Sequence, residues 1–271
     1  MPSTELLDLA RAIALEAGEL AALRRREGVE VAATKSTIVD VVTEADREVE
    51  RLIRERILAA RPDDAILGEE GGSAAGTSGL TWVVDPIDGT VNYLYGIPHY
   101  GISIAVVEGD PDPLTWNAVA AAVLNPAIGE LFTATAGGGA FLGDQAIRVA
   151  DSVPLELALI STGFAYAAET RERQGEVVTR LLPLVRDIRR QGTASLDLGF
   201  VACGRSNAYF ERTLSPWDHA AGALIAREAG AVVKGLGDAA PSRDFILAAA
   251  PELAARLEEL LVELGAADYP I

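Results

Sequence analysis

Hydrophobic residues recur at two different periods along this chain, and the change of period divides it into regions. Over 4–25 the apolar positions return every three or four residues, and the same spacing follows Thr43 over 44–60. This is the spacing of one buried face of a helix, and threonine is a common residue at a helix N-cap. The pattern therefore predicts two N-terminal helices that pack together as a helical layer.

Short apolar runs without helical spacing occupy the middle of the chain. They lie at 80–84, 101–107, 116–124, 130–135 and 140–142. Runs of this length between turn residues are typical of buried strands, and the glycines at 137–139 supply the last turn. Because each run follows the previous one directly, we expect one sheet built as a meander.

After residue 150 the two patterns alternate. The predicted order is strand 157–162, helix 172–183, strand 185–189, helix 194–203, strand 207–210, helix 217–229, strand 244–249 and helix 252–264. Alternation of this kind indicates a layered α/β (α+β) fold. A chain of 271 residues can bury one core or two packed halves. We expect a single domain over 1–271, with an N-terminal α+β half at 1–150 and a C-terminal α/β half at 151–271.

Composition narrows the class of protein. No apolar stretch approaches the ~20 residues that span a membrane, and the N-terminus lacks the pattern of a signal peptide. The formal charge of −17, with basic residues gathered only at 24–26 and 186–190, argues against nucleic acid as a partner. Cys203 is the only cysteine, so it forms no internal disulfide and is expected to pack. We expect a cytoplasmic protein with no membrane partner.

The most informative chemistry lies in the run WVVDPIDGT at 82–90. An apolar strand ends there in two carboxylates, and Pro86 is expected to turn the chain so that Asp85 and Asp88 converge. Gly89 permits close approach of a phosphate, and Thr90 would open a helix whose amides face an anion. Carboxylate oxygens suit Mg²⁺ or Mn²⁺ better than zinc. A proline turn with an Asx cap explains the same residues about equally well.

Two further segments present acids at the ends of elements. Glu69 and Glu70 follow a short apolar run and precede glycines, and Asp218 lies in the first turn of a predicted helix. Taken alone, Asp218 is explained by helix capping. Acids delivered by three separate segments nevertheless indicate a site assembled on α/β layers.

Together these segments resemble a known family, the inositol monophosphatases, which are Mg²⁺-dependent and lithium-sensitive phosphatases. The shared motifs appear in order as KSTIVDVVTEAD at 35–46, GEE at 68–70, DPIDGT at 85–90, and PWD at 216–218 with EAG at 228–230. Four motifs in register are far more specific than one. The segments at 96–98, 189–194 and 219–223 resemble bacterial members, the actinobacterial ones among them. The resemblance implies the α-β-α-β-α sandwich of the inositol monophosphatase and fructose-1,6-bisphosphatase superfamily, and a homodimer.

The resemblance also implies a set of metal ligands. Glu69, Asp85 and the main-chain carbonyl of Ile87 would hold one Mg²⁺, and Asp85, Asp88 and Asp218 a second. A weaker third ion would lie near Glu69, and Mn²⁺ could replace Mg²⁺. Bound cations would reverse the local field, which removes the conflict between an acidic chain and an anionic substrate.

The catalytic roles are implied in the same way. Glu69 and Thr90 would orient and deprotonate the attacking water, and Asp46 would hydrogen-bond the Thr90 hydroxyl. Glu70 would support Glu69 or its loop, and the amides of Gly89 and Thr90 would hold the phosphate. Local sequence alone favours Asp46 as a helix cap, since it follows Thr43. His99 and His219 lack the neighbours of a phosphohistidine nucleophile and are expected to pack.

Substrate choice depends on the rim of the site. Gly192, Thr193, Ala194 and Glu211 match the positions with which the family binds inositol hydroxyls, together with Asp88 and Asp218. Locally, Glu211 could equally be a charged turn residue after a strand. We expect a small phosphate monoester, inositol 1-phosphate, as substrate. Fructose 1,6-bisphosphate, histidinol phosphate and phosphoadenosine stay open as alternatives, as does a regulatory binding protein that retains the fold.

Overall fold

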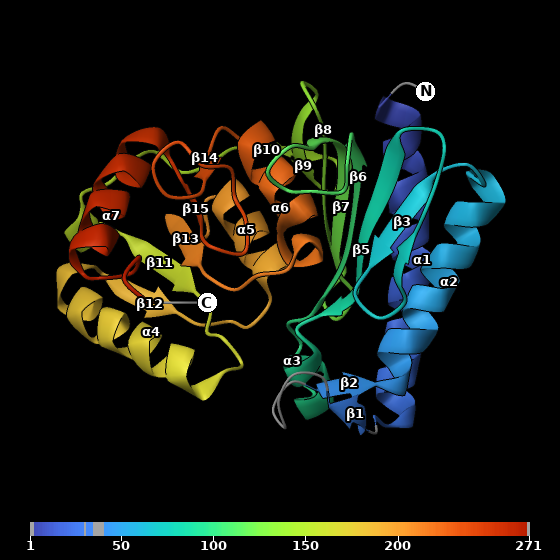
Figure 1. The fold of residues 1–271 in the computed structure, drawn as a ribbon, viewed down its shortest axis with the longest axis horizontal. Coiled ribbons are helices and arrows are strands. Elements are labelled where there is room, and N and C mark those ends of the chain that lie inside the picture. Colours follow the sequence, from blue (N-terminus) through green and yellow to red (C-terminus); the bar gives the residue numbers. More distant parts are fainter. Residues whose placement is uncertain (1–2, 30, 35–40, 270–271) are drawn as a thin grey trace.

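A computed structural model describes residues 3–29, 31–34 and 41–269 of the chain (Figure 1). In Figure 1 two outer helices, a sheet, two inner helices, a second sheet and two more outer helices follow one another across the molecule. This is the layered α-β-α-β-α arrangement that the family resemblance implies. None of the described helices combines the length and apolar content that crossing a membrane requires.

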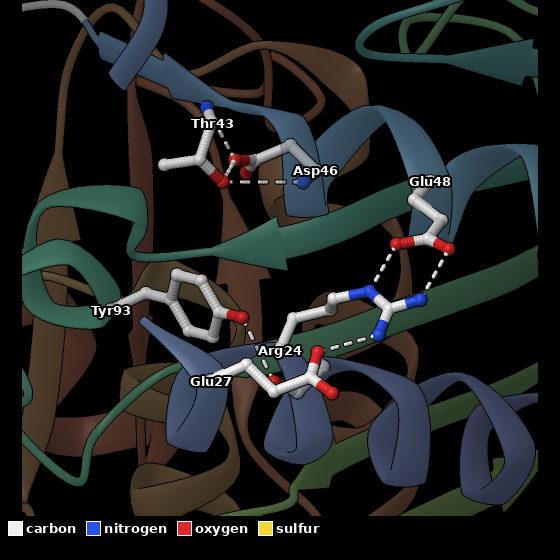
Figure 2. Close-up of polar contacts among 7 residues, drawn as sticks. Arg24, Glu27, Thr43, Asp46, Glu48 and Tyr93 are labelled. Carbon is white, nitrogen blue, oxygen red and sulfur yellow. Dashed lines mark hydrogen bonds and ion pairs between the residues drawn. The ribbon is translucent and has the colours of Figure 1, made fainter. Parts of the chain in front are cut away.

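The first outer layer is formed by α1 (Ser3–Glu27) and α2 (Glu44–Ala60), close to the predicted bounds. Each buries one stripe of apolar residues against the first sheet, as the helical spacing requires. Figure 2 shows the guanidinium of Arg24 between Glu27 of its own helix and Glu48 of α2, at 2.6 and 2.5 Å. This contact fixes α1 and α2 against each other.

The larger sheet in the described part of the chain has eight strands in the order β10-β9-β8-β7-β6-β5-β3-β4. Their bounds are β3 Ala65–Gly68, β4 Gly72–Ala74, β5 Leu80–Asp88, β6 Gly101–Glu108, β7 Asn117–Asn125, β8 Glu130–Thr135, β9 Gly139–Leu142 and β10 Gln145–Ile147. The strands from β5 to β10 pair antiparallel with their neighbours, so the predicted meander is confirmed. The parallel pairing of β3 with β5 brings the ends of these two strands to one edge.

One local prediction is wrong, because the chain does not leave the sheet at Pro86. Strand β5 continues to Asp88, and its pairing with β6 skips from Asp85–Ser103 to Asp88–Gly101. Between these two pairs the chain advances three residues on β5 but only two on β6, so β5 contains a β-bulge. Proline has no amide hydrogen to give to the ladder, so the extra residue is accommodated at this position. The bulge, and not a turn, places both aspartates at the sheet edge.

The second sheet is mixed, in the order β12-β11-β13-β15-β14 among the described residues. Its strands are β11 Leu159–Thr162, β12 Asp187–Arg189, β13 Ala208–Glu211, β14 Val232–Lys234 and β15 Ile246–Ala249, and α4 (Ala168–Leu181) and α7 (Pro251–Glu263) form its outer layer. Strand β11 begins later than predicted because a 3-10 turn occupies Leu155–Leu157, and α4 begins four residues earlier. The short strands β1 (Val31–Thr34), β2 (Val41–Thr43), β4, β10 and β14 carry too few apolar residues to be recognised by periodicity.

Helices α5 (Ala194–Ala202) and α6 (Pro216–Glu228) lie between the two sheets and are buried on nearly all sides. Small residues allow this close packing. A Cβ atom on Gly222 of α6 would lie 2.7 Å from the Leu198 side chain of α5. A shared hydrophobic core joins α5 and α6 to strands of both sheets. The position of Asp218, in the first turn of α6, is therefore set by the packing of the whole middle layer.

Candidate functional site

A cleft of about 490 Å³ opens where β3 and β5 end and α5 and α6 begin. Its volume lies in the range of small-molecule sites. Among the predicted site residues, those in its wall are Glu69, Asp85, Ile87, Asp88, Gly89, Thr90, Gly192, Thr193, Ala194, Glu211 and Asp218. Segments from 69 to 218 thus meet in one place, while Asp46 and Glu70 are not part of the cleft lining.

The two aspartates of β5 are held by main-chain amides. Asp85 is buried, and its Oδ1 accepts a hydrogen bond from the amide of Ile87 at 3.1 Å. Asp88 Oδ2 accepts from the amide and the hydroxyl of Ser195, at 2.8 and 2.5 Å. In each case the protein fixes one carboxylate oxygen.

The chain turns sharply after Asp88 at Gly89. Its φ of +92° lies in the left-handed region, and an added Cβ would lie 2.5 Å from Thr193 Oγ1. Glycine is therefore required both by the backbone conformation and by the close approach of the 192–194 segment. Gly89 is the N-cap of α3 (Thr90–Tyr95), which confirms that Thr90 opens a helix. The hydroxyl of Tyr93 on α3 donates to the carbonyl of Ala21 at 2.8 Å and fixes this short helix against α1 (Figure 2).

Asp46 serves two structural purposes at once. Its Oδ2 accepts from the amide of Thr43 at 2.7 Å, and its own amide donates to Thr43 Oγ1 at 3.3 Å, which is a capping box (Figure 2). Its Oδ1 accepts from the Thr90 hydroxyl at 3.2 Å. Burial raises the pKa of Asp46 to about 7 despite the hydrogen bonds from Thr43, and the charges of Glu69 and Glu70 raise it further. The capping role and the contact with Thr90 are both present.

The turn that carries Glu69 is fixed by hydrogen bonds to Glu50 of α2. The buried carboxylate of Glu50 accepts from the amides of Glu70 and Gly71 at 2.7 and 2.8 Å, and from Arg54 Nε at 2.6 Å. A Cβ on Gly68 or Gly71 would collide with the Glu50 carboxylate. Glu50 was not anticipated from the sequence, although its spacing of four residues from Asp46 places both acids on one face of α2.

Asp218 also combines a cap with a place in the cleft wall. Its Oδ2 accepts from the amide of Ser215 at 2.6 Å, closing the capping box of α6. Pro216 occupies the first turn, where its missing amide hydrogen is harmless. The capping interpretation of Asp218 is therefore correct without excluding a role in the cleft.

The acids of the cleft raise one another's pKa. Burial, followed by the charges of Glu69, Asp88 and Asp218, raises the pKa of Asp85 well above its ordinary value. Burial, with Glu69 and Asp88, does the same for Asp218, and burial and Glu69 raise the pKa of Asp88 to about 7 against the hydrogen bonds from Ser195. Buried acids that repel one another are an unstable arrangement unless a cation or protons compensate them.

The donor set suits a hard divalent cation. All of its side-chain donors are carboxylate oxygens, and they face a cleft open to water. Among the described residues, no three or more histidine, cysteine, aspartate or glutamate side chains are arranged so that they could hold a metal ion. Mg²⁺ retains several waters and accepts substrate oxygens, so it fits an open, oxygen-only wall.

The residues predicted to bind substrate hydroxyls, at 192–194 and Glu211, also line the cleft. Asn92 Nδ2 of α3 donates to the carbonyls of His99 and Gln191 at 2.8 and 2.7 Å, which ties the 190–193 segment to α3. Glu211 is the last residue of β13, so the interpretation as a turn residue after the strand is wrong. Its Oε2 accepts from the Tyr209 hydroxyl at 2.6 Å, and removal from bulk water raises the pKa of Glu211 to about 7.

Several residues of the cleft were not anticipated from the sequence. They are Gly163, Phe164, Ala165, Tyr166, Ala167, Thr170, Arg190, Thr213, Leu214, Ser215, Trp217 and Arg243. Thr170 lies in α4 and Trp217 in α6, and the others come from loops of the C-terminal half, where no periodic pattern marks a cleft wall. His99 and His219 are outside the cleft lining, and burial lowers the pKa of both rings, that of His219 to about 4. The motif residues 35–40 lie outside the described residues.

Comparison with known proteins adds independent information. The sequence profile of the inositol monophosphatase family matches residues 3–266. A relative from Mycobacterium tuberculosis named inositol-1-monophosphatase SuhB is 44% identical, over 89% of this chain and 83% of its own. A relative from Xylella fastidiosa named Nus factor SuhB is 41% identical, over 84% and 83%. The solved structure of the extragenic suppressor protein suhB from Bartonella henselae has a TM-score of 0.86 at 34% identity, covering 95% of this chain and 98% of that one.

Proposed function

This chain belongs to the inositol monophosphatase family, and from that premise we propose that it is a Mg²⁺-dependent phosphatase that hydrolyses inositol 1-phosphate to inositol and phosphate. The observation that carries the proposal is the convergence of Glu69, Asp85 and Asp218 from separate segments on one cleft. A cleft built only to bind a neutral ligand has no use for several buried, mutually repelling carboxylates.

The residues fit a site for two divalent cations. Glu69, Asp85 and the carbonyl of Ile87 would hold the first, and Asp85, Asp88 and Asp218 the second, with a weaker third near Glu69. When bound, Mg²⁺ neutralises charge on the phosphoryl oxygens and on the leaving alkoxide.

The chain's own groups orient the attacking water. Thr90 Oγ1 lies 3.2 Å from Asp46 Oδ1 and 3.2 Å from the carbonyl of Ile87. We assign Thr90 and Glu69 to hold the water, with Asp46 accepting the proton that Thr90 passes on. A carboxyl with a pKa of about 7 is suited to gain and lose a proton near neutrality.

The rest of the wall would bind the substrate. The amides of Gly89 and Thr90 are assigned to the phosphate. Glu211, with the 192–194 segment, is assigned to the ring hydroxyls, because a carboxylate accepts hydrogen bonds from two neighbouring hydroxyls.

The direct test is release of inorganic phosphate from inositol 1-phosphate over a Mg²⁺ titration, with Asp85→Asn as the matched variant. The asparagine side chain keeps an oxygen for the Ile87 amide but loses the charge. We expect hydrolysis that requires Mg²⁺ and falls by orders of magnitude in the variant. Wild-type protein that releases no phosphate at any Mg²⁺ concentration would overturn the proposal.

Substrate identity needs a panel of phosphate esters. Fructose 1,6-bisphosphate, histidinol phosphate and phosphoadenosine are compared with inositol 1-phosphate in wild type and Glu211→Gln. Loss of one charged acceptor should raise the KM for the polyol about 10- to 100-fold and spare a simple ester without ring hydroxyls. Equal losses on both substrates would remove Glu211 from substrate recognition.

A regulatory binding role is the second candidate, and the name Nus factor SuhB of the Xylella fastidiosa relative favours it. Such a role does not need the charge of Asp85, so binding of the partner would survive Asp85→Asn while hydrolysis would not. Lithium sensitivity and a homodimer remain predictions, to be checked by LiCl titration of the activity and by sedimentation of the intact protein.

A further inference from the structure

Asp88 receives an unusual amount of support from the opposite half of the chain. One of its oxygens, Oδ2, accepts from both the amide and the hydroxyl of Ser195, at 2.8 and 2.5 Å. Ser195 is completely buried and Asp88 is 8% exposed. The contact joins residues 107 positions apart, so it links the end of β5 directly to the start of α5.

The geometry arises at the N-terminus of α5. The N-cap residue Thr193 makes no side-chain capping bond, and its hydroxyl donates to the carbonyl of His99 at 3.1 Å. Asp88, at the end of β5, supplies the missing acceptor for the Ser195 amide and so caps α5 in place of Thr193. A carboxylate there is also favoured by the helix dipole.

Both hydrogen bonds from Ser195 are accepted by the same oxygen, Oδ2 of Asp88. With Oδ2 committed to Ser195, the orientation of the Asp88 carboxylate is set, while its side chain forms part of the cleft wall. The hydrogen bond from the amide would form with any residue except proline at 195, since the N–H belongs to the backbone. The hydroxyl bond depends on serine.

We propose that the Ser195 hydroxyl is a positioning group for a divalent cation, holding Asp88 Oδ2 so that Oδ1 is presented to the ion. This inference rests on the proposed metal-dependent function. Groups that fix the orientation of a ligand typically change metal affinity about 10- to 100-fold when removed. Without the hydroxyl, the Asp88 carboxylate loses its shortest hydrogen bond and is held by the amides of Ser195 and Ala194, so its orientation is less firmly fixed.

A purely structural role for Ser195 makes a different prediction. If the Asp88 contact only gives the buried Ser195 hydroxyl a hydrogen-bond partner, removal of the hydroxyl changes folding stability and leaves metal affinity unchanged. Ser206 provides a matched control, because it is also buried and its hydroxyl lies 2.9 Å from that of Ser161 in a serine pair away from the cleft wall.

The experiment is calorimetric titration of the whole protein with MgCl₂ alone, and again with MnCl₂, in wild type, Ser195→Ala and Ser206→Ala. Thermal melting without metal reports folding. We expect Ser195→Ala to weaken Mg²⁺ binding about 10- to 100-fold, and Ser206→Ala to bind as the wild type does. Ser195→Gly, which also keeps the amide, serves if the alanine variant is unstable.

Each result has a definite meaning. Affinity within about twofold of wild type in Ser195→Ala or Ser195→Gly overturns the role of Ser195 and leaves the proposed phosphatase intact. Equal weakening in Ser206→Ala assigns the effect to general loss of packing and also overturns it. Wild-type protein that binds neither ion removes both the metal site and this inference.

Discussion

At the scale of single residues, the acids in and beside the cleft use one carboxylate oxygen for a structural hydrogen bond. Oδ2 of Asp46 and Oδ2 of Asp218 each accept a hydrogen bond from the N-cap amide of their own helix. Oδ2 of Asp88 accepts from Ser195 of α5. The remaining oxygen is directed elsewhere, as shown by the contact of Asp46 Oδ1 with Thr90. From sequence, a cap and a functional acid look like competing explanations. In the folded chain the two explanations are compatible, because one oxygen of Asp46 caps α2 while the other contacts Thr90.

Thr90→Ala should separate chemistry from binding. The hydroxyl contacts Asp46 and the carbonyl of Ile87, so its loss removes the group assigned to the water and leaves the amides assigned to the phosphate. We expect kcat to fall about 100-fold or more, with KM changed less than about threefold. Thr90→Ser keeps the hydroxyl and should retain most of the activity. Steady-state kinetics at saturating Mg²⁺ decides, and a kcat within about twofold of wild type in the alanine variant contradicts the role.

Glu211→Gln should change the pH dependence of stability. The pKa of Glu211 is raised from 4.5 to about 7, so the folded protein holds this proton more tightly than the unfolded chain. Wild-type stability therefore falls as pH rises from 4.5 through 7. Glutamine does not titrate, so the stability of the variant lacks this dependence on pH. The variant should match wild type at about pH 4.5 and exceed it by about 2 kcal/mol at about pH 8, allowing for the open side of the cleft.

Chemical denaturation at several pH values measures this difference, with exposed Glu259→Gln as the control. A constant difference between Glu211→Gln and wild type across the range would show that the carboxyl of Glu211 titrates normally.

At the scale of elements, α2 aligns two parts of the cleft that are distant in sequence. Asp46 contacts Thr90 at the start of α3, and one turn later Glu50 holds the amides that follow Glu69. A straight helix fixes the separation of these two acids. Displacement of α2 would therefore move Thr90 and Glu69 together, preserving their relation to each other.

Glu50→Gln tests whether the turn at 68–72 depends on this helix. The amide cannot accept from all of Arg54 and the amides of Glu70 and Gly71, and its NH₂ group meets a donor. We expect a loss of about 2–3 kcal/mol in the free energy of unfolding. Urea denaturation measures it, and Glu55→Gln on the exposed side of α2 should change it by less than about 0.5 kcal/mol. Equal, small effects would show that the turn holds itself.

The same scale shows what sequence can predict. The long helices and the runs 101–107 and 130–135 were located well, because many buried residues repeat the signal. Strand β14, with three residues, carries no such repetition. At Pro86, local chemistry indicated a turn, but pairing with β6 retained the strand as a bulge. The sequence motifs predict the acids of the cleft wall. They do not indicate Ser195 or Glu50, because the contacts of both residues are with partners far away in the chain.

At the scale of the whole molecule, the cleft depends on the assembly of all layers. Asp85 belongs to the first sheet, Glu211 to the second and Asp218 to the middle layer. A shared core of buried residues, including Val83, Leu198 and Ile246, joins these layers. Folding therefore brings the negative charges together, and hydrophobic burial must outweigh their repulsion.

Mg²⁺ should therefore stabilise the entire fold. A ligand that binds only the folded state adds about 2.7 kcal/mol at about 100 times its Kd, which corresponds to a rise of about 5–10 °C in Tm for a chain of this size. Asp85→Asn should be more stable than wild type without metal, because one repelling charge is gone, and should lose most of the Mg²⁺-dependent rise. Differential scanning calorimetry at constant ionic strength tests both. An equal rise in the two proteins would place the stabilising cation elsewhere.

The contact of Gly222 with Leu198 bears on how the protein can be altered in the laboratory. Because a methyl group at 222 would lie 2.7 Å from the Leu198 side chain, the α5–α6 crossing has no room for larger residues. Combinatorial libraries aimed at new substrates should leave that crossing unchanged. The exposed cleft residues Tyr166 and Arg243 can vary without disturbing it. Diversity placed in those loops would sample specificity, whereas diversity placed in the middle layer would chiefly yield unfolded chains.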